Sequence, residues 1–318
     1  MLKIAVLTSG GDAPGMNAAL RACVRTGIRY GCQMHVIENG FRGLIEGLII
    51  PVTRDTVKDI ISRGGTIIKT SRSEAFKEVE VQKAAIQRLR DLEIDGLIVI
   101  GGDGTYRGVR ELCRLGYPCI GIPATIDNDI ASTDFTIGFD TCLNTICECV
   151  DKLRDTSTSH QRCSIIEVMG RKCGDLAVFA GVAEGVEMVL SFDHQLTNEQ
   201  INKRLSDLKE GGKSHAIVLV SENLLDIKEL AKVIQDGTGF ECKTEVLGRL
   251  QRGGKPSAVD RILASRFGNM AVKLLLANRT SECVGIRNNQ IVSYTFDEAL
   301  DMERESKHEY ITLLDVLK

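Results

Sequence analysis

The sequence predicts an α/β protein of two lobes, each built on a mostly parallel sheet sandwiched by helices. Short, nearly continuous apolar runs alternate along the chain with amphipathic stretches of helical length. Strands of that kind are typical of parallel sheets covered on both faces. A chain of 318 residues can also bury more than one core. Loops rich in glycine and aspartate follow several apolar runs, at the strand ends where open α/β sheets bind ligands.

Hydrophobic periodicity, read in chain order, locates the expected elements. Apolar runs predict strands at Ile4–Leu7, Met34–Ile37, Gly96–Ile100, Cys119–Ile122, Ser164–Val168, Ala216–Val220 and Lys243–Leu247. Amphipathic spacing predicts helices at Asn17–Tyr30, Val79–Leu92, Thr105–Leu115, Thr141–Asp155, Asn198–Glu210 and Asp260–Ala277. No low-complexity linker interrupts the chain, so we expect it to cross between the two lobes more than once.

Composition argues against several classes of protein. A formal net charge of −3 disfavours a nucleic-acid binder with a broad basic surface. The apolar run at Ile4–Leu7 is too short for a secretory signal, and no apolar stretch reaches the roughly 18 residues of a membrane span. The 11 cysteines contain no C-x-x-C pair and are interpreted as packing residues in a reducing compartment. We therefore expect a cytoplasmic protein that binds neither nucleic acid nor membrane.

Three loops that follow predicted strands carry the chemistry, namely Thr8–Asp12, Gly101–Thr105 and Pro123–Asp129. Glycine at a strand-to-helix turn lets backbone N–H groups approach an anion, and the helix that follows adds its N-terminal dipole. Any one such loop can also be a tight turn without a ligand, because a lone glycine motif is weak evidence.

The aspartates of these loops indicate a divalent cation and a base. Asp103 lies inside a glycine loop, where a bare carboxylate repels phosphate unless Mg²⁺ bridges the two. Asp127 and Asp129 are separated by one residue, so in an extended segment their side chains point the same way. One can act as a base while the other assists the metal or orients its neighbour. The alternative interpretation of this segment is a helix N-cap or an Asx turn.

Two standard nucleotide-binding loops are missing. The dinucleotide fingerprint requires glycine where Arg107 stands, and the P-loop requires glycine where Asp207 stands. A Rossmann dehydrogenase and a Walker-type ATPase are therefore both disfavoured. Arginines in or near loops offer planar forks for phosphate, although each one alone is usually a solvated surface residue. They are Arg72, Arg162, Arg171, Arg249 and Arg252.

Taken together, the motifs resemble those of the bacterial 6-phosphofructokinase family. The matching segments, in chain order, are Leu7–Asn17, Ile100–Thr105, Pro123–Asp129, Met169–Arg171 and Gln251–Gly254. The resemblance runs from about Met1 to at least Val292. It implies phosphoryl transfer from Mg–ATP to the 1-hydroxyl of fructose 6-phosphate in glycolysis. It also implies a nucleotide-binding lobe at 1–138 and 251–302 and a sugar-phosphate-binding lobe at 139–250 and 303–318.

The resemblance assigns a role to individual residues. Asp127 would be the base, Thr125 would lie beside the transferred group, and Asp103 would hold Mg²⁺ with Asp129 close by. Charge on the moving phosphoryl group would be stabilised by Gly11, Arg72 and Arg171. The implied nucleotide-binding set is Gly11, Arg72, Gly102, Asp103, Gly104, Thr105 and Gly108. The implied sugar-phosphate set is Thr125, Asp127, Arg162, Met169, Gly170, Arg171, Glu222, Lys243, Arg249 and Arg252.

Members of the family are usually homotetramers, in which the positions of Arg162 and Lys243 reach the sugar's 6-phosphate from a neighbouring subunit. Lys243 stands where arginine is usual, so the two-pronged geometry is lost, and Arg249 stands where histidine is usual. We expect the pocket still to bind a sugar 6-phosphate, with an altered affinity.

Two small residues bear on the phosphoryl donor. Pyrophosphate-using relatives typically carry aspartate and lysine at the positions of Gly104 and Ala124, so ATP is favoured here, although Ala124 replaces the glycine usual in ATP-dependent members. The alternatives are a pyrophosphate-dependent phosphofructokinase and a related sugar-phosphate kinase. A non-catalytic regulatory paralogue is least favoured, because Asp103, Thr125 and Asp127 are retained.

An effector site for ADP or phosphoenolpyruvate is also implied by the resemblance. The matching positions are Arg21, Arg25, Arg54, Asp59, Arg154, Glu187, Lys213 and His215. Arg21 and Arg25 are one helical turn apart, which is equally typical of a solvated stripe. Gly211 and Ser214 replace residues that are usually basic, so we expect blunted regulation.

Overall fold

The computed structural model describes residues 1–71 and 73–317. The chain forms two compact units and passes between them more than once. The larger unit comprises Met1–Thr141 and Arg252–Arg304, and the smaller unit comprises Cys142–Gln251 and Glu305–Lys318. Each unit has its own sheet and its own hydrophobic core.

The larger unit is built on a mixed sheet with a parallel centre. Its strands are β1 (Lys3–Thr8), β2 (Gln33–Ile37), β3 (Ile49–Val52), β4 (Gly96–Gly101), β5 (Cys119–Pro123), β10 (Glu282–Arg287) and β11 (Gln290–Thr295). In the described part of the chain they form a seven-stranded sheet in the order β11-β10-β5-β4-β1-β2-β3. The inner strands are parallel, and the edge strands β3 and β11 run antiparallel to their neighbours.

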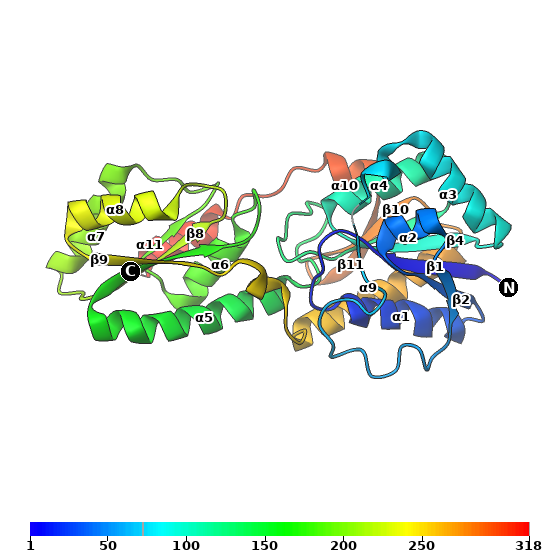
Figure 1. Ribbon diagram of the computed structural model, residues 1–318, viewed down its shortest axis with the longest axis horizontal. Helices are drawn as coiled ribbons and strands as arrows, with labels where there is room; N and C mark the ends of the chain where they lie inside the picture. Colours follow the sequence, from blue (N-terminus) through cyan, green and yellow to red (C-terminus); the bar gives the residue numbers. More distant parts are fainter. Residues whose placement is uncertain (72, 318) are drawn as a thin grey trace. The chain divides into compact units, whose positions relative to one another are not determined.

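Helices cover both faces of this sheet (Figure 1). One face carries α1 (Met16–Arg29) and α9 (Ala258–Leu276), which pack against each other. The other face carries α2 (Gly40–Glu46), the 3₁₀ turn η1 (Glu74–Lys77), α3 (Val79–Asp91), α4 (Asp103–Arg114) and α10 (Phe296–Asp301). Tyr106 of α4 meets Phe296 of α10 edge-on at 5.4 Å between ring centroids, deep in the core. This aromatic contact anchors the helix that begins at Asp103.

The smaller unit has a parallel sheet in the order β7-β8-β6-β9. Its strands are β6 (Arg162–Val168), β7 (Met188–Leu190), β8 (Ala216–Ser221) and β9 (Glu241–Val246). Its helical segments are α5 (Phe139–His160), α6 (Asp175–Glu184), α7 (Asn198–Glu210), α8 (Ile227–Thr238), the 3₁₀ turn η2 (Gly248–Arg252) and α11 (His308–Val316). α7 and α8 pack together over the sheet, and α11 packs on α6 through Tyr310 and Phe179, whose ring centroids are 4.5 Å apart.

The predicted fold class is confirmed, and every predicted strand and helix is present, α7 with the predicted bounds and the others with one or both ends shifted. Several elements escaped prediction for physical reasons. Helix α6 is apolar on most sides, so it lacks an amphipathic period. Strand β7 spans only Met188–Leu190, and edge strand β11 is only half-buried, so it lacks a long apolar run. Among the described residues, no helix combines the length and apolarity needed to span a bilayer.

Asp260 of α9 fixes the start of α5. The side chain is 1% exposed, and its two oxygens accept hydrogen bonds from the backbone N–H of Gly138 at 2.8 Å and from both the backbone N–H (2.8 Å) and the hydroxyl (2.5 Å) of Thr141. The carboxylate therefore satisfies donors at a helix N-terminus, where the helix dipole also favours negative charge.

We expect Asp260→Ala to lower the free energy of unfolding by about 2–3 kcal/mol, because buried N–H groups are left unsatisfied. Chemical denaturation would measure the loss. Asp236→Ala, at an exposed position of α8, is the control and should stay within about 0.5 kcal/mol of wild type. Equal effects of the two substitutions would contradict this role of Asp260.

Candidate active site

The loop after β1 is hydrogen-bonded to β4, and the guanidinium of Arg252 lies against its Gly11. The Ser9 N–H donates to the Ile100 carbonyl at 2.9 Å. A Cβ added to Gly11 would lie 2.1 Å from Nη1 of Arg252, so a side chain there would displace this guanidinium. The same nitrogen is 3.9 Å from a carboxylate oxygen of Asp12. Arg252, expected to contact the sugar, therefore lies directly on the loop expected to bind the donor.

The loop after β4 leads into α4 and is closely packed at Gly101. A Cβ on Gly101 would be 2.4 Å from Oγ1 of Thr105 and 2.6 Å from the Ser9 carbonyl oxygen. Oγ1 of Thr105 is buried and has no hydrogen-bond partner among the described residues. Gly104 differs, since a Cβ there would meet nothing within 4 Å. This loop thus presents a hydroxyl without a partner and an open surface beside Asp103.

The loop after β5 is organised by its own side chains. Oγ1 of Thr125 donates to Oδ2 of Asp127 at 3.2 Å and accepts from the Asp127 N–H at 3.2 Å. Asn128, at φ 52°, accepts from the Thr136 N–H at 3.0 Å and donates to the Asp134 carbonyl at 3.2 Å. The N-cap interpretation of this segment is wrong, because the next helix begins only at Phe139. Asp127 is 2% exposed, at the end of a buried strand.

The last two loops lie side by side. β4 and β5 are parallel neighbours in register, with Gly101 opposite Pro123. A Cβ on Gly102 would be 3.4 Å from Cβ of Thr125. The larger unit therefore brings Gly11, Gly102, Thr105, Thr125 and Arg252 to one edge of its sheet, together with the turns that carry Asp103 and Asp127. Arg72 lies outside the described residues.

In the smaller unit, two side chains shape the Met169–Arg171 turn. Oε1 of Glu222 accepts from the backbone N–H groups of Gly170 at 3.2 Å and Arg171 at 2.8 Å. The fully buried Gln251 accepts from the Met169 N–H at 3.0 Å and donates to the Gly248 carbonyl at 3.0 Å. Glu222 was expected to contact the sugar, and here it also holds backbone. Sequence reasoning quoted Gln251 within a motif but gave it no role, since nothing in its spacing indicates burial.

The two cations expected to reach a neighbour's sugar phosphate share one carboxylate. Arg162 lies opposite Glu241 in the β6–β9 pairing, and its Nε is 2.9 Å from Oε2 of Glu241. Nζ of Lys243 is 3.0 Å from the other oxygen. The neighbouring Arg162 and then Lys243 lower the pKa of the Glu241 carboxyl. Sequence reasoning missed Glu241, because a glutamate on a polar edge strand carries no distinctive signal. Arg249 is exposed in η2.

The residues expected to bind an effector fall into two groups, one in each unit. In the larger unit, burial and then the neighbouring Arg25 lower the pKa of Arg21. Arg54 and Asp59 are exposed on the loop that follows β3. In the smaller unit, the residues are hydrogen-bonded as follows: Arg154 to the Glu184 carbonyl, Lys213 to Glu187, the Ile217 N–H to Glu187, and His215 to Thr158. Glu187 is 2% exposed, and Lys213 and that backbone donor satisfy its buried oxygens.

The oxygen donors suit Mg²⁺ bound together with phosphate. The described residues contain no group of three or more histidine, cysteine, aspartate or glutamate side chains that could hold a metal ion. Asp103 instead offers one partly exposed carboxylate beside the glycine loop. Mg²⁺ usually keeps water and phosphate ligands and needs only one or two carboxylates. The residues therefore fit a cation that arrives with a nucleotide.

An α/β unit whose strand-end loops gather glycine backbone, carboxylates and a guanidinium has the groups that phosphoryl transfer requires. Residues 3–275 match the profile of the family described as "Phosphofructokinase". The chain belongs to this family.

Individual relatives agree with this assignment. The chain is 50% identical, over 100% of its length and 99% of the relative, to an "ATP-dependent 6-phosphofructokinase" of Clostridium botulinum (strain Eklund 17B / Type B). It is 52% identical to the protein of that name from Clostridium tetani (strain Massachusetts / E88), over 95% of each chain. Among solved structures, Saccharomyces cerevisiae phosphofructokinase aligns with a TM-score of 0.89 and 32% identity, covering 100% of this chain and 47% of the yeast chain. A pyrophosphate-dependent phosphofructokinase from Marinobacter aquaeolei, at 22% identity over 98% of this chain and 86% of its own, shares the fold with a TM-score of 0.86.

Gln251 offers a test of how the Met169–Arg171 turn is held. We expect Gln251→Ala to lower the free energy of unfolding by about 2 kcal/mol, because a buried N–H and a carbonyl lose their partners. Chemical denaturation followed by circular dichroism would measure it. Gln195→Ala, at an exposed position of the same unit, is the matched control and should change stability by less than about 0.5 kcal/mol. A harmless Gln251→Ala would show that the turn is held by other contacts.

Proposed function

We propose that this protein is an ATP-dependent 6-phosphofructokinase that phosphorylates the 1-hydroxyl of fructose 6-phosphate in glycolysis. The near-complete match to relatives bearing that name supports the proposal. Its main structural support is the placement of the Asp103 loop beside the Thr125–Asp127 loop, at the ends of two adjacent parallel strands. The products are fructose 1,6-bisphosphate and ADP. We place this activity in the cytoplasm.

Asp127 is the proposed base. In the reaction, the 1-hydroxyl oxygen forms a bond to the γ-phosphorus, its proton passes to Asp127, and the bond to the β-phosphate oxygen breaks. The hydrogen bond from Thr125 restrains the Asp127 carboxylate. Asp129 lies two residues further along the same loop and assists. General bases of this kind contribute about 10²–10⁴ in rate.

Charge on the moving phosphoryl group is the main catalytic demand. We assign its stabilisation to the Gly11 backbone and to the side chains of Arg72 and Arg171. The adjacent Gly102, Thr105 and Gly108 complete the nucleotide-binding set. Asp103 holds Mg²⁺, which when bound neutralises phosphate charge. Arg252 lies against Gly11, so a residue assigned to the sugar phosphate contacts the loop assigned to the donor.

The sugar phosphate is assigned to Met169, Gly170, Arg171 and Glu222 together with Arg252. Oε1 of Glu222 holds the turn, so its second oxygen is the one proposed to accept from a sugar hydroxyl. The 6-phosphate is assigned to Arg249 and, across a homotetramer interface, to Arg162 and Lys243.

Regulation by ADP or phosphoenolpyruvate is proposed to be weak. Gly211 and Ser214, both exposed, remove two cations usual in the family's effector site. The remaining effector set is Arg21, Arg25, Arg54, Asp59, Arg154, Glu187, Lys213 and His215. Because Lys213 already pairs with the buried Glu187, an anionic effector must compete with that carboxylate.

Asp127→Ser tests the base. We expect kcat to fall by about 10²–10⁴ while the affinity for fructose 6-phosphate changes by less than about threefold, since the side chain acts on the proton. A coupled assay with saturating Mg–ATP and a direct titration of the sugar phosphate would measure both. Asp236→Ser, in α8, serves as control. Unaltered turnover would remove Asp127 from the mechanism.

Gly104→Asp tests the donor. The space beyond Gly104 is open, so an aspartate would project into the proposed nucleotide site and repel ATP. We expect KM for ATP to rise at least about tenfold, with normal folding because an acidic residue suits the first turn of a helix. Gly104→Ala is the matched control and should change KM little. Assays of both variants and wild type with ATP and with pyrophosphate would also test the alternative donor, and faster turnover of wild type with pyrophosphate would overturn ATP dependence.

A further inference from the structure

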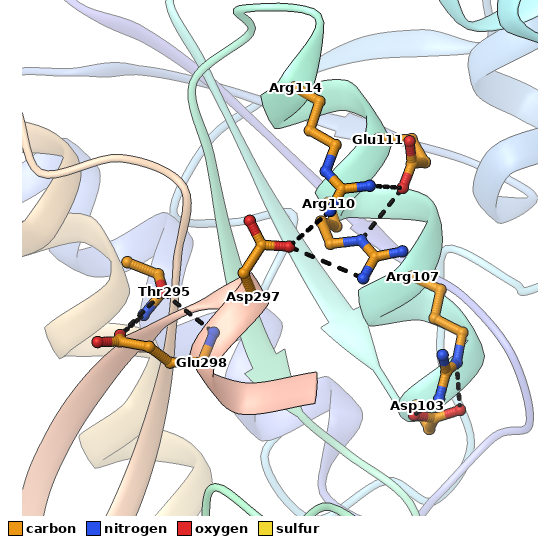
Figure 2. Close-up of polar contacts among 8 residues, drawn as sticks. All are labelled: Asp103, Arg107, Arg110, Glu111, Arg114, Thr295, Asp297 and Glu298. Atoms are coloured by element: carbon orange, nitrogen blue, oxygen red, sulfur yellow. Dashed lines mark hydrogen bonds and ion pairs between the residues drawn. The ribbon is translucent and has the colours of Figure 1, made fainter. Parts of the chain in front are cut away.

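Asp103 is already paired within its own helix. Nε of Arg107 lies 3.0 Å from Oδ2 of Asp103, and Nη2 lies 3.1 Å from Oδ1, so one guanidinium engages both carboxylate oxygens (Figure 2). The two residues are one turn apart on α4. The arginine side chain is 58% exposed and the aspartate side chain 37% exposed, so both can exchange partners with a bound ligand. The residue proposed to hold Mg²⁺ is therefore occupied by a cation of the chain itself.

The other arginines of α4 are used differently. Arg110 and Arg114 pair with Glu111 of the same helix and with Asp297 of α10 (Figure 2). Helices α4 and α10 pack together. The pairs with Asp297 join α4 to α10, whereas those with Glu111 lie within α4. Within α4, all of which is described, Arg107 is the arginine that pairs with the carboxylate of the glycine loop.

We propose that Arg107 determines how strictly donor binding requires a divalent cation. The inference rests on the proposed function, because it takes Asp103 as the magnesium ligand. While Arg107 holds Asp103, the cation must displace the guanidinium before the carboxylate can bind it. While it is paired with Arg107, the Asp103 carboxylate also repels a metal-free triphosphate less than a bare carboxylate would. Arg107 therefore weakens the preference for the magnesium complex through both effects.

Removal of the guanidinium should strengthen the preference for the magnesium complex. Without Arg107, the bare Asp103 carboxylate attracts the magnesium complex and repels the metal-free nucleotide. The ratio of the two dissociation constants, metal-free over magnesium-bound, should rise. For a partly exposed pair we expect an increase of about three- to tenfold.

The experiment is calorimetric titration of the full-length protein with ADP and with a non-hydrolysable ATP analogue, each with Mg²⁺ and with a chelator. Arg107→Gln should raise the ratio, and Arg107→Lys, which keeps the charge but loses the fork, should give an intermediate value. Arg114→Gln is the matched control, an ion-paired arginine of the same helix, and should leave the ratio unchanged. Thermal unfolding of each variant would establish that it is folded.

A second comparison isolates the pair. In an Asp103→Asn background, Arg107→Gln should no longer raise the ratio, because the carboxylate that it unmasks is gone. An unchanged ratio in folded Arg107→Gln, or an equal change with Asp103→Asn present, would overturn the inference while leaving the proposed function intact. Failure of wild type to bind any nucleotide would overturn both.

Discussion

The parallel register of β1, β4 and β5 is the constraint on which the candidate site depends. Thr8 lies opposite Ile100, and Gly101 lies opposite Pro123, so the three strands end at the same edge of the sheet. These strands are buried on both faces, and unpaired polar groups inside them would be costly. The polar residues can begin only where the strands stop. The sheet thus gathers hydroxyls, carboxylates and glycine backbone from distant parts of the sequence.

Absence of side chains is the second requirement at this edge. Gly101 faces Oγ1 of Thr105 and the Ser9 carbonyl at distances that no Cβ tolerates, and Gly11 faces the guanidinium of Arg252. Gly104 is different, because its missing side chain leaves open surface. The same residue type therefore has two uses here. In one it permits close packing between loops, and in the other it keeps space for a ligand.

Pairing of functional charges recurs in both units. Asp103 is held by Arg107, the Arg162 and Lys243 cations share Glu241, and the buried Glu187 is held by Lys213. Such pairs neutralise groups that would otherwise repel one another or carry a desolvation cost. Each proposed ligand therefore has to compete with an ion-pair partner that the protein itself supplies. Under the proposed function, ligand binding would therefore be linked to the exchange of ion pairs.

The fold class, the order of the main elements, the family and the three strand-end loops could all be predicted from the sequence. This was possible because buried parallel strands require apolar runs, and because glycine and aspartate at strand ends are local patterns. The sequence could not reveal that Asn128 fixes the Asp127 loop, that Gln251 holds Met169, or that Arg252 lies on Gly11. These contacts form only in the folded chain, because they join side chains to groups brought together by loop geometry and by sheet register. Neither loop geometry nor sheet register can be inferred from short-range spacing along the chain.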